Sequence, residues 1–353
     1  MLLAVSGGPD STALMHAAAA VGAAPGASAQ VAIQVATVDH GLRPASAAEA
    51  EGVARAARAL RLPHAVLSWA GPKPGTGLQD AARAARYALL AAHAEKIGAG
   101  LVLTGHTLDD QAETVLMRLA AGSGPAGLAG MRVERPLAPG IALGRPFLNL
   151  PKAALVAWCE ARGILHLRDP ANADPRFARA RLRAAWPVLE REGLSPQRLA
   201  RLAERAARDD AALRIAAEQA LDAALLPGGP PLRLDGAALA ALPEAVALRC
   251  LDGALTRAGA GPRRLERLEA LILGTLLPAL RRREASRRTL AGFLVASDAA
   301  GIISLAPAPP RRQKAADAAL AAGGLDLLGK GEPPAYIGEV CTDGPTKPSG
   351  ASV

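Results

Sequence analysis

Short apolar runs alternate with longer alanine-rich stretches along the first hundred residues of the chain. Four runs have the length of buried strands: Leu2–Val5, Val31–Val38, Ala65–Trp69 and Leu101–Thr104. The stretches that separate them show helical spacing, at about Thr12–Val21, Ala45–Leu60 and Leu78–Ile97. Strands that alternate with helices form a parallel sheet with helices on both faces. The sequence therefore predicts an α/β domain whose ligands bind beyond the carboxyl ends of the strands.

The pattern changes in the second half of the chain. One helix is predicted at Lys152–Arg162, and a long arginine-rich helical segment spans about Ala178 to Leu226, before a Gly-Gly-Pro-Pro run. Two helical and two alternating, hairpin-like stretches follow, at Leu239–Ala258, Pro262–Leu277, Thr289–Val295 and Gly301–Ala306. We therefore expect an α/β domain at 1–190, a helical linker at 191–231, a small α+β domain at 232–308 and a low-complexity, partly disordered tail at 309–353.

Composition excludes several classes of protein. Half of the 353 residues are apolar, which is enough for more than one core and excludes a disordered chain. The three cysteines, Cys159, Cys250 and Cys341, lie far apart, so the sequence has neither a disulfide framework nor a zinc or iron–sulfur spacing. No apolar stretch reaches the roughly 18 residues of a membrane span, and no signal peptide is visible. We expect a soluble, cytoplasmic protein that does not bind membranes.

The charge favours a polyanionic partner. Lys and Arg exceed Asp and Glu by 41 to 32, which gives a net charge of +9 and a pI near 10.2. Residues 176–214 contain ten arginines against five acidic residues, and residues 281–288 contain five arginines against one glutamate. Such stripes suit RNA phosphates, although a solvated helix face has the same composition. Base stacking is not expected to dominate, because only eight residues are aromatic.

The first candidate site is the segment Ser6–Thr12, which joins the first predicted strand to the first predicted helix. Gly7 and Gly8 let the backbone approach an anion, and the helix N-terminus adds positive potential. The segment is not a Walker sequence, which disfavours a kinase or GTPase of that type. An ordinary glycine turn with Asp10 or Ser11 as the helix cap is the alternative. The position after a strand favours phosphate binding.

The second candidate site is the acidic segment Thr104–Thr114, which follows the fourth predicted strand. If a helix starts near Asp109, Asp110 and Glu113 lie three residues apart and share one face. Two carboxylates there can hold Mg²⁺ against phosphates or accept a proton. A capping pair of Asp109 and Glu113 is the alternative.

Two further groups are weaker candidates. The segment Val38–Arg43 ends the second predicted strand, so Asp39 and His40 reach the same sheet edge. Arg83 and Arg86 lie three residues apart on a predicted helix, next to Tyr87, where arginines more often form a solvated face.

These segments resemble those of one enzyme family. The run Ser6–Ser11 is similar to the SGGxDS loop of the N-type ATP pyrophosphatases, the PP-loop superfamily, which cleave ATP to AMP and pyrophosphate. Further segments narrow the resemblance to the tRNA(Ile)-lysidine synthetases: Val38–Arg43, Ala82–Tyr87, Gly105–Thr114, Gly122–Met131, Arg145–Phe147, Asp169–Asn172 and Arg179–Arg183. The resemblance is strong over about residues 1–190 and weak at Thr289–Gly292.

The resemblance implies an adenine nucleotide alpha-hydrolase-like fold and a two-step ligation. The C2 oxygen of the wobble cytidine of an isoleucine tRNA with a CAU anticodon attacks the α-phosphate of ATP, and L-lysine then displaces AMP. It implies catalytic roles for Asp10, Asp110, Glu113 and Arg86, Mg²⁺ on Asp10 and Asp110, and tRNA contacts by Arg179, Arg181 and Arg183. It implies ATP binding by Ser6, Gly7, Gly8, Pro9, Asp10, Ser11, Asp39, His40, Gly105 and His106.

Some features depart from the family pattern, and two rival functions stay open. Alanines stand at positions 171 and 180, where the family has serine and asparagine, so side-chain contacts are not expected there. The family also has residues ahead of the first strand, so we expect the natural chain to start before Met1. The rivals are another RNA-modifying member of the superfamily and a basic RNA-binding protein with a non-catalytic nucleotide site. Paired thiolase cysteines and a glutaminase-like domain are not apparent in the sequence.

Overall fold

The computed structural model describes residues 1–23, 31–42, 46–71, 73–167 and 178–309. Arg43, the segment Asp169–Asn172 and nearly all of the tail expected to be partly disordered lie outside the described residues. In the part that is described, no helix is both long enough and apolar enough to cross a membrane.

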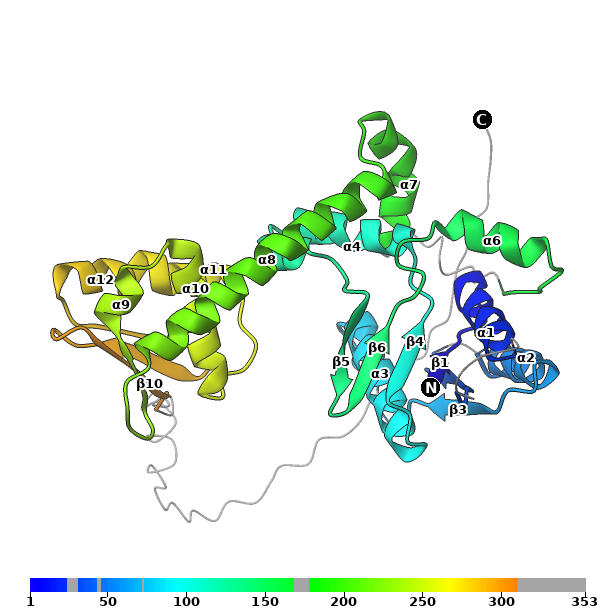
Figure 1. The fold of residues 1–353 in the computed structure, drawn as a ribbon, viewed down its shortest axis with the longest axis horizontal. Coiled ribbons are helices and arrows are strands. Elements are labelled where there is room, and N and C mark those ends of the chain that lie inside the picture. The colour runs from blue at the N-terminus through cyan, green and yellow to red at the C-terminus, as the bar shows by residue number, and fades with distance from the viewer. Residues whose placement is uncertain (24–30, 43–45, 72, 168–177, 310–353) are drawn as a thin grey trace, which may run out of the picture. The chain divides into compact units, whose positions relative to one another are not determined.

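A six-stranded sheet forms the centre of the first half of the chain (Figure 1). Its order is β3-β2-β1-β4-β6-β5, in which β5 alone runs antiparallel to its neighbour. The strands are β1 (Leu2–Ala4), β2 (Gln34–Asp39), β3 (His64–Ser68), β4 (Leu101–Thr104), β5 (Glu134–Ala138) and β6 (Ile141–Gly144). The fold is therefore the expected α/β type with a mainly parallel sheet.

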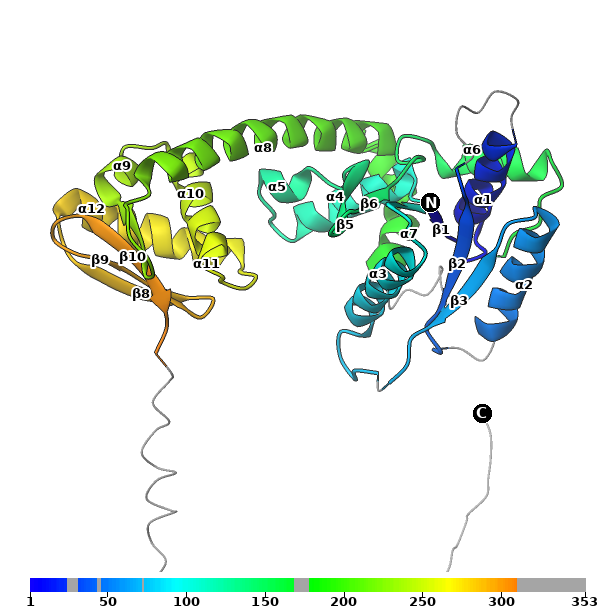
Figure 2. The same cartoon turned by 60° about the horizontal axis from the view of Figure 1, so that its bottom comes forward.

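Helices cover both faces of this sheet, as Figure 2 shows. Successive residues of a strand point to opposite faces, so Leu2 packs with α3 (Leu78–Lys96) while Leu3 packs with α1 (Pro9–Gly22) and α2 (Ser46–Ala59). Both leucines are fully buried. The continuous apolar run at the N-terminus is thus explained by burial on both sides.

The four predicted strands and three predicted helices of this half are present, with ends shifted by a few residues. The strands β5 and β6 were not predicted. The strand β5 contains Arg135 and Pro136, and it pairs only with β6, so its sequence lacks the apolar signal of a central strand.

The predicted single helix from Ala178 to Leu226 is two helices, α7 (Ala178–Arg191) and α8 (Pro196–Ala224). Gly193 has φ +83°, Ser195 is the N-cap of α8 and accepts a hydrogen bond from the Arg198 N–H, and Pro196 is the first residue of α8. A glycine followed by a serine N-cap and a proline is a common sequence signal for the end of one helix and the start of the next. Three shorter helices precede α7: α4 (Leu108–Ala120), α5 (Pro125–Leu128) and α6 (Lys152–Glu160).

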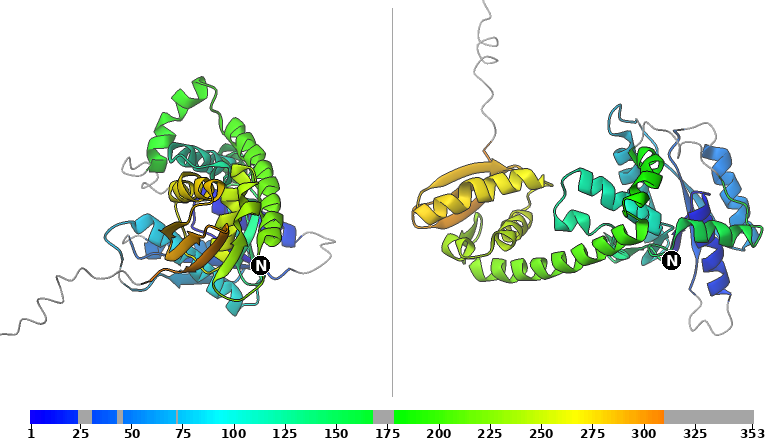
Figure 3. Two further views of the ribbon diagram at one scale, coloured as in Figure 1. Left: turned by 90° about the vertical axis from the view of Figure 1, so that its left-hand side faces the viewer. Right: turned by 90° about the horizontal axis from the view of Figure 1, so that it is seen from above.

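The region from β7 onward has a core of its own, with an antiparallel sheet in the order β7-β10-β9-β8 (Figure 3). Its helices are α9 (Gly236–Ala240), α10 (Glu244–Arg257), α11 (Leu265–Leu271), the π-helical turn η2 (Ile272–Leu276) and α12 (Leu277–Arg282). Its strands are β7 (Leu232–Asp235), β8 (Ser286–Leu290), β9 (Phe293–Ser297) and β10 (Ile302–Pro307).

Two predictions for this region were wrong in detail. Pro243 separates α9 from α10, which were predicted as one helix. The predicted strand Thr289–Val295 is the end of β8, a tight turn at Ala291 and Gly292, and the start of β9. Both residues of that turn have positive φ, at +48° and +81°, which the alternation of apolar residues does not reveal.

Candidate active site

The candidate site begins where the loops after β1 and β4 meet. The strand β1 lies between β2 and β4 in the sheet. The chain continues from β1 to β2 on one side and later adds β4 on the other side, so the carboxyl ends of β1 and β4 form a switch point of the sheet. A Cβ atom on Gly105 would lie 2.8 Å from the backbone carbon and oxygen of Asp10. Glycine at position 105 therefore lets the two loops touch.

The first loop presents backbone N–H groups at the start of α1. Gly7 has φ +86°, Gly8 is the N-cap, and Pro9 is the first helical residue. The Ser11 hydroxyl donates a hydrogen bond to the Gly8 carbonyl oxygen at 3.1 Å and accepts one from the Ser6 N–H at 3.1 Å. The alternative of Asp10 or Ser11 as the helix cap is wrong, because Gly8 holds that position without a side-chain cap. A helix N-terminus of this kind can bind an anion.

Asp10 lies within this loop and is mostly buried. Its Oδ2 accepts a hydrogen bond from Lys152 Nζ at 2.8 Å, whereas Oδ1 is buried and has no hydrogen-bond partner among the described residues. Burial raises the pKa of Asp10, and Lys152 opposes the rise. Lys152 was not predicted as a site residue. It begins α6, and its backbone N–H also donates to Asp109 Oδ2 at 2.7 Å.

The acidic segment caps α4 in an unexpected way. The helix starts at Leu108, one residue before the expected start, and Thr107 is its N-cap. Asp110 Oδ2 accepts hydrogen bonds from the Thr107 N–H at 2.9 Å and from the Thr107 hydroxyl at 3.1 Å. The alternative in which Asp109 caps the helix with Glu113 is therefore wrong. Asp110, the third residue of the helix, forms the capping box with the N-cap residue Thr107 instead.

Asp110 and Glu113 share one face of α4, as predicted, and α7 brings two arginines to that face. Arg183 donates to both oxygens of Glu113, from Nε at 2.6 Å and from Nη2 at 3.2 Å. Arg179 lies farther away, with Nη1 3.7 Å from Asp110 Oδ1 and Nε 4.0 Å from Glu113 Oε2. Glu113 is only 4% exposed. Burial raises the pKa of Glu113, and Arg183 limits the rise.

Two histidines lie at the same sheet edge. His106 Nδ1 is 2.8 Å from the Thr104 hydroxyl, and burial lowers the pKa of His106 to about 4. His40 packs edge-on against Trp69 with ring centroids 5.9 Å apart, and its Nδ1 is buried without a partner among the described residues. Burial, then the charge of Arg86, lowers the pKa of His40, so Arg86 lies near this group.

The remaining predicted residues are less closely gathered. Asp39 Oδ1 accepts a hydrogen bond from the Gly41 N–H at 2.8 Å, which lowers the pKa of Asp39. Arg181 lies on α7 between the two arginines that face the carboxylates. Among the described residues, no three His, Cys, Asp or Glu side chains are grouped closely enough to hold a metal by themselves.

Three relatives in other organisms resemble the chain over most of its length. A tRNA(Ile)-lysidine synthase from Methylobacterium sp. (strain 4-46) is 58% identical over 318 residues, which cover 89% of this chain and 90% of that protein. That of Methylobacterium nodulans is 57% identical over 317 residues, which cover 88% of this chain and 91% of that protein. That of Rhodopseudomonas palustris is 48% identical over 327 residues, which cover 88% of this chain and 91% of that protein.

A family model described as a PP-loop domain matches residues 1–189, the part of the chain that contains the glycine loop together with Asp110 and Glu113. A match over more than half of the chain and relatives of this identity place the chain in the tRNA(Ile)-lysidine synthase family of PP-loop proteins.

Proposed function

We propose that this chain joins L-lysine to C2 of the wobble cytidine in the CAU anticodon of a minor isoleucine tRNA, with cleavage of ATP to AMP and pyrophosphate. The observation that carries the assignment is the meeting of the glycine loop after β1 with the carboxylate face of α4 at one switch point. One side of this site suits a polyphosphate and the other suits an ammonium group. ATP and L-lysine, the substrates implied by membership of the family, match these two sides of the site.

The loop from Ser6 to Ser11 would bind the pyrophosphate part of ATP. Its N–H groups and the N-terminus of α1 would stabilise the negative charge that develops on the pyrophosphate as its bond to the α-phosphate breaks. Asp39 and His40 at the end of β2, with Gly105 and His106 after β4, would lie beside the nucleotide, because β2 and β4 are the two neighbours of β1. Arg86, which lies near His40, would face the phosphate or adenylate charge.

Asp10 fits a Mg²⁺ ion that is held mainly by phosphates. Its Oδ1 is buried and unpaired among the described residues, and Mg²⁺ commonly takes one or two carboxylate oxygens and completes its shell with phosphates and water. When bound, the ion would neutralise charge on the leaving pyrophosphate. Asp110 Oδ1 is the second candidate ligand for the ion, but only while no lysine ammonium occupies it, because the other oxygen of Asp110 is occupied in the helix cap.

Asp110 and Glu113 would receive the side chain of lysine. Asp110 Oδ1 has Arg179 at 3.7 Å, beyond hydrogen-bond distance, so this oxygen is available to an incoming ammonium. The amine, with an ordinary pKa of about 10.4, must lose a proton before it attacks C2. Glu113 is the proposed acceptor because burial raises its pKa. Its bond to Arg183 would have to open, which frees Arg183 for the phosphate of the adenylated cytidine.

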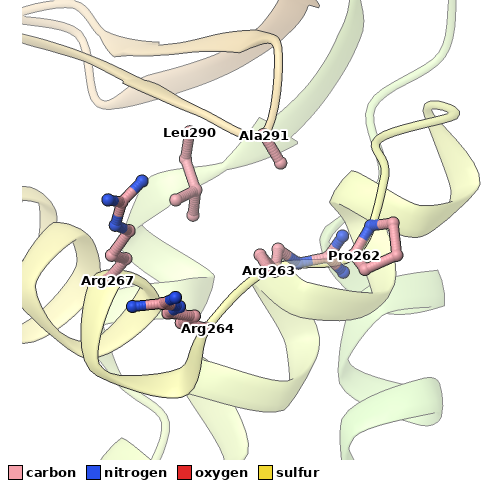
Figure 4. Close-up of a pocket in the computed structure, with 6 residues that line it drawn as sticks. All are labelled: Pro262, Arg263, Arg264, Arg267, Leu290 and Ala291. Carbon is pink, nitrogen blue, oxygen red and sulfur yellow. The ribbon is translucent and has the colours of Figure 1, made fainter. Parts of the chain in front are cut away.

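The tRNA would be held by basic surfaces as well as by the site. Arg179, Arg181 and Arg183 are the proposed contacts on α7. A hollow of about 250 Å³ beside α11 adds a second region, lined by three arginines from Arg263 to Arg267 together with Pro262, Leu290 and Ala291 (Figure 4). Arg263 pairs with Asp252, while Arg264 and Arg267 form no ion pair with any described residue. Because this substrate is tRNA, we further propose that the protein works in the cytoplasm.

One experiment tests the assignment directly. Full-length protein is incubated with ATP, Mg²⁺, L-lysine and a CAU-anticodon isoleucine tRNA transcript, and the mass of the RNA is measured. We expect one lysine condensed at the wobble cytidine, with AMP and pyrophosphate as products, and none when that cytidine is replaced by uridine. Folded protein that binds ATP and RNA but leaves the RNA mass unchanged would overturn the proposal and favour a non-catalytic RNA-binding protein.

A further inference from the structure

Three arginines from distant parts of the sequence lie near Tyr87, and a fourth lies near one of them. The Cζ atoms of Arg83, on α3, and of Arg135, on β5, each lie 5.2 Å from the centre of the Tyr87 ring. Arg145, directly after β6, lies near enough for the Tyr87 side chain to affect its pKa. Arg118, near the end of α4, is close enough for the charge of Arg83 to lower its pKa after the larger effect of burial. We call these four residues and Tyr87 the Tyr87 arginine cluster.

Among the residues that the structure describes, no acidic side chain pairs with an arginine of this cluster. Arg118 donates to the carbonyl oxygens of Gly127 and Gly130, at 2.7 and 2.8 Å. Arg135 and Arg145 likewise donate to carbonyl oxygens, those of Pro136 and Arg132. None of the four arginines forms an ion pair within the described ranges of the chain. The contacts that the described part of the chain makes with these guanidinium groups are to carbonyl oxygens and to an aromatic ring.

Such an arrangement is costly for a protein without a ligand. Arg145 is 3% exposed, and its Nε is buried with no hydrogen-bond partner among the residues that the structure describes. Burial, together with the neighbouring charges of Arg135 and Arg83, lowers the pKa of Arg145. A buried cation without a counter-ion is destabilising, and an anionic ligand would offset that cost.

The cluster borders the active site on the side away from the glycine loop. Arg135 is paired with Leu143 near the carboxyl end of β6, and β6 is the neighbour of β4. The charges of Arg145 and Arg83 contribute to the lowered pKa of His106, after burial and against the effect of Asp110. In the strand order, β5 is three strands from β1, about 14 Å at the usual spacing. Phosphates bound at the β1 loop are therefore not the natural counter-ions of Arg135.

We propose that Arg83, Arg135 and Tyr87 form a binding site for the anticodon-loop backbone next to the wobble cytidine, an inference that rests on the proposed function. Guanidinium groups bind phosphate oxygens through paired N–H donors, and a guanidinium plane or a tyrosine ring can stack on an unpaired base. Arg118 and Arg145 fix the scaffold, because their hydrogen bonds hold the carbonyl groups of Gly127, Gly130 and Arg132.

The test compares RNA binding with ATP binding in the full-length chain. Arg83→Ala, Arg135→Ala and the double variant are titrated with a CAU anticodon stem–loop RNA at several salt concentrations, and with ATP. We expect the double variant to bind the stem–loop at least about tenfold more weakly, with a salt slope shallower by roughly one to two, because each lost phosphate contact removes about 0.7. ATP binding should be unchanged.

The matched control is Arg58→Ala on α2, which removes one positive charge from an exposed arginine that pairs with Glu51. It should leave stem–loop binding close to that of the unaltered chain. Tyr87→Phe keeps the ring and removes the hydroxyl, so it should weaken binding less than Tyr87→Leu. Thermal melting identifies any variant that loses its fold, and Arg83→Gln and Arg135→Gln then replace the alanine variants.

Two results would overturn the inference. One is a folded double variant that binds the stem–loop with unaltered affinity and salt slope, and the other is an equal loss of ATP and RNA binding. Lysidine formation by the unaltered chain is measured in parallel. If the unaltered chain makes lysidine and the double variant binds RNA normally, the inference fails alone. If the unaltered chain binds the stem–loop but makes no lysidine, the proposed function fails instead.

Discussion

Lys152 places its ammonium nitrogen 2.8 Å from Oδ2 of Asp10, a residue 142 positions earlier in the chain. The pair connects the start of α1 to α6, and the bond from the Lys152 N–H to Asp109 connects α6 to α4 as well. Because Asp10 is mostly buried, its carboxylate depends on this partner for much of its stabilisation.

The first prediction concerns this pair. Lys152→Met should lower the free energy of unfolding at pH 7 by about 1–3 kcal/mol, because it leaves a buried carboxylate without its partner. In an Asp10→Asn background the same substitution should cost less than about 1 kcal/mol, since the amide carries no charge. A double-mutant cycle in urea measures the difference. Equal costs in the two backgrounds would show that Lys152 acts through packing alone.

The second prediction separates the glycine loop from folding. A Cβ on Gly8 would meet no atom closer than 4.0 Å, and no positive φ is required there, so Gly8→Ala should fold normally. Gly8→Val should block the approach of phosphate to the backbone and abolish pyrophosphate release. Gly105→Ala should instead lose both fold stability and activity, because its Cβ would overlap the backbone of Asp10.

The control for these variants is Gly75→Ala, where a Cβ meets nothing within 4 Å. It should change neither the melting temperature nor turnover. Normal ATP turnover by Gly8→Val would rule out phosphate binding by this loop.

The sequence predicted the parts of this site that depend on local patterns. The run from Ser6 to Ser11 follows a strand whose apolar residues are continuous, and Asp110 and Glu113 lie three residues apart on a helix, so their common edge and common face could be predicted. The α7–α8 break also had a local signal, in Gly193, Ser195 and Pro196, which the arginine-rich composition of the segment obscured.

Long-range contacts could not be predicted in the same way. A lysine at the start of a helix is usually solvated, and nothing near Lys152 in the sequence indicates Asp10 as its partner. The Tyr87 arginine cluster joins two helices, a strand and a loop. Arg135 lies on β5, and Arg145 directly follows β6. The sequences of these two strands have too weak an apolar pattern to be recognised as strands. Such contacts are determined by the tertiary arrangement of the sheet.

The third prediction distinguishes the carboxylates of α4 from their structural roles. Asp110→Asn keeps an oxygen that can accept the Thr107 N–H, and Glu113→Gln keeps a partner for Arg183, so each should cost less than about 1 kcal/mol of stability. Both should abolish lysine transfer while cytidine adenylation, measured as pyrophosphate release, continues. Thr107→Ala is the control, since it removes the cap hydroxyl at a cost of about 0.5–2 kcal/mol and keeps both carboxylates.

If Thr107→Ala loses as much lysine transfer as Asp110→Asn does, the loss in Asp110→Asn is caused by the altered helix cap. Loss of pyrophosphate release in Glu113→Gln would move the role of Glu113 from lysine activation to the first step.

The fourth prediction concerns acid stability. The folded pKa of His106, about 4, lies below the value of about 6.5 in an unfolded chain, so the unfolded state binds more protons between these pH values. The contribution of neutral His106 is therefore complete above about pH 6.5 and is lost as the pH falls toward 4. Replacement by Gln should flatten the stability profile between pH 7 and 5, as measured by urea unfolding. A profile of unchanged slope would mean that His106 titrates normally in the fold.

The last prediction tests whether the hollow beside α11 contacts tRNA. Arg264 and Arg267 line it without ion pairs among the described residues, whereas Arg263 is tied to Asp252 and is only 7% exposed. Arg264→Ala with Arg267→Ala should therefore flatten the salt dependence of full-length tRNA binding by roughly one to two in the log–log slope, because each neutralised phosphate contributes about 0.7–0.9. Binding of the isolated anticodon stem–loop should not change, since this region is proposed to contact other parts of the tRNA. Arg263→Ala serves as the contrasting variant: it should lower stability, through the loss of its pair with Asp252, more than it changes the slope. An unaltered slope for full-length tRNA in the folded double variant would show that the hollow is a solvated surface with no role in RNA binding.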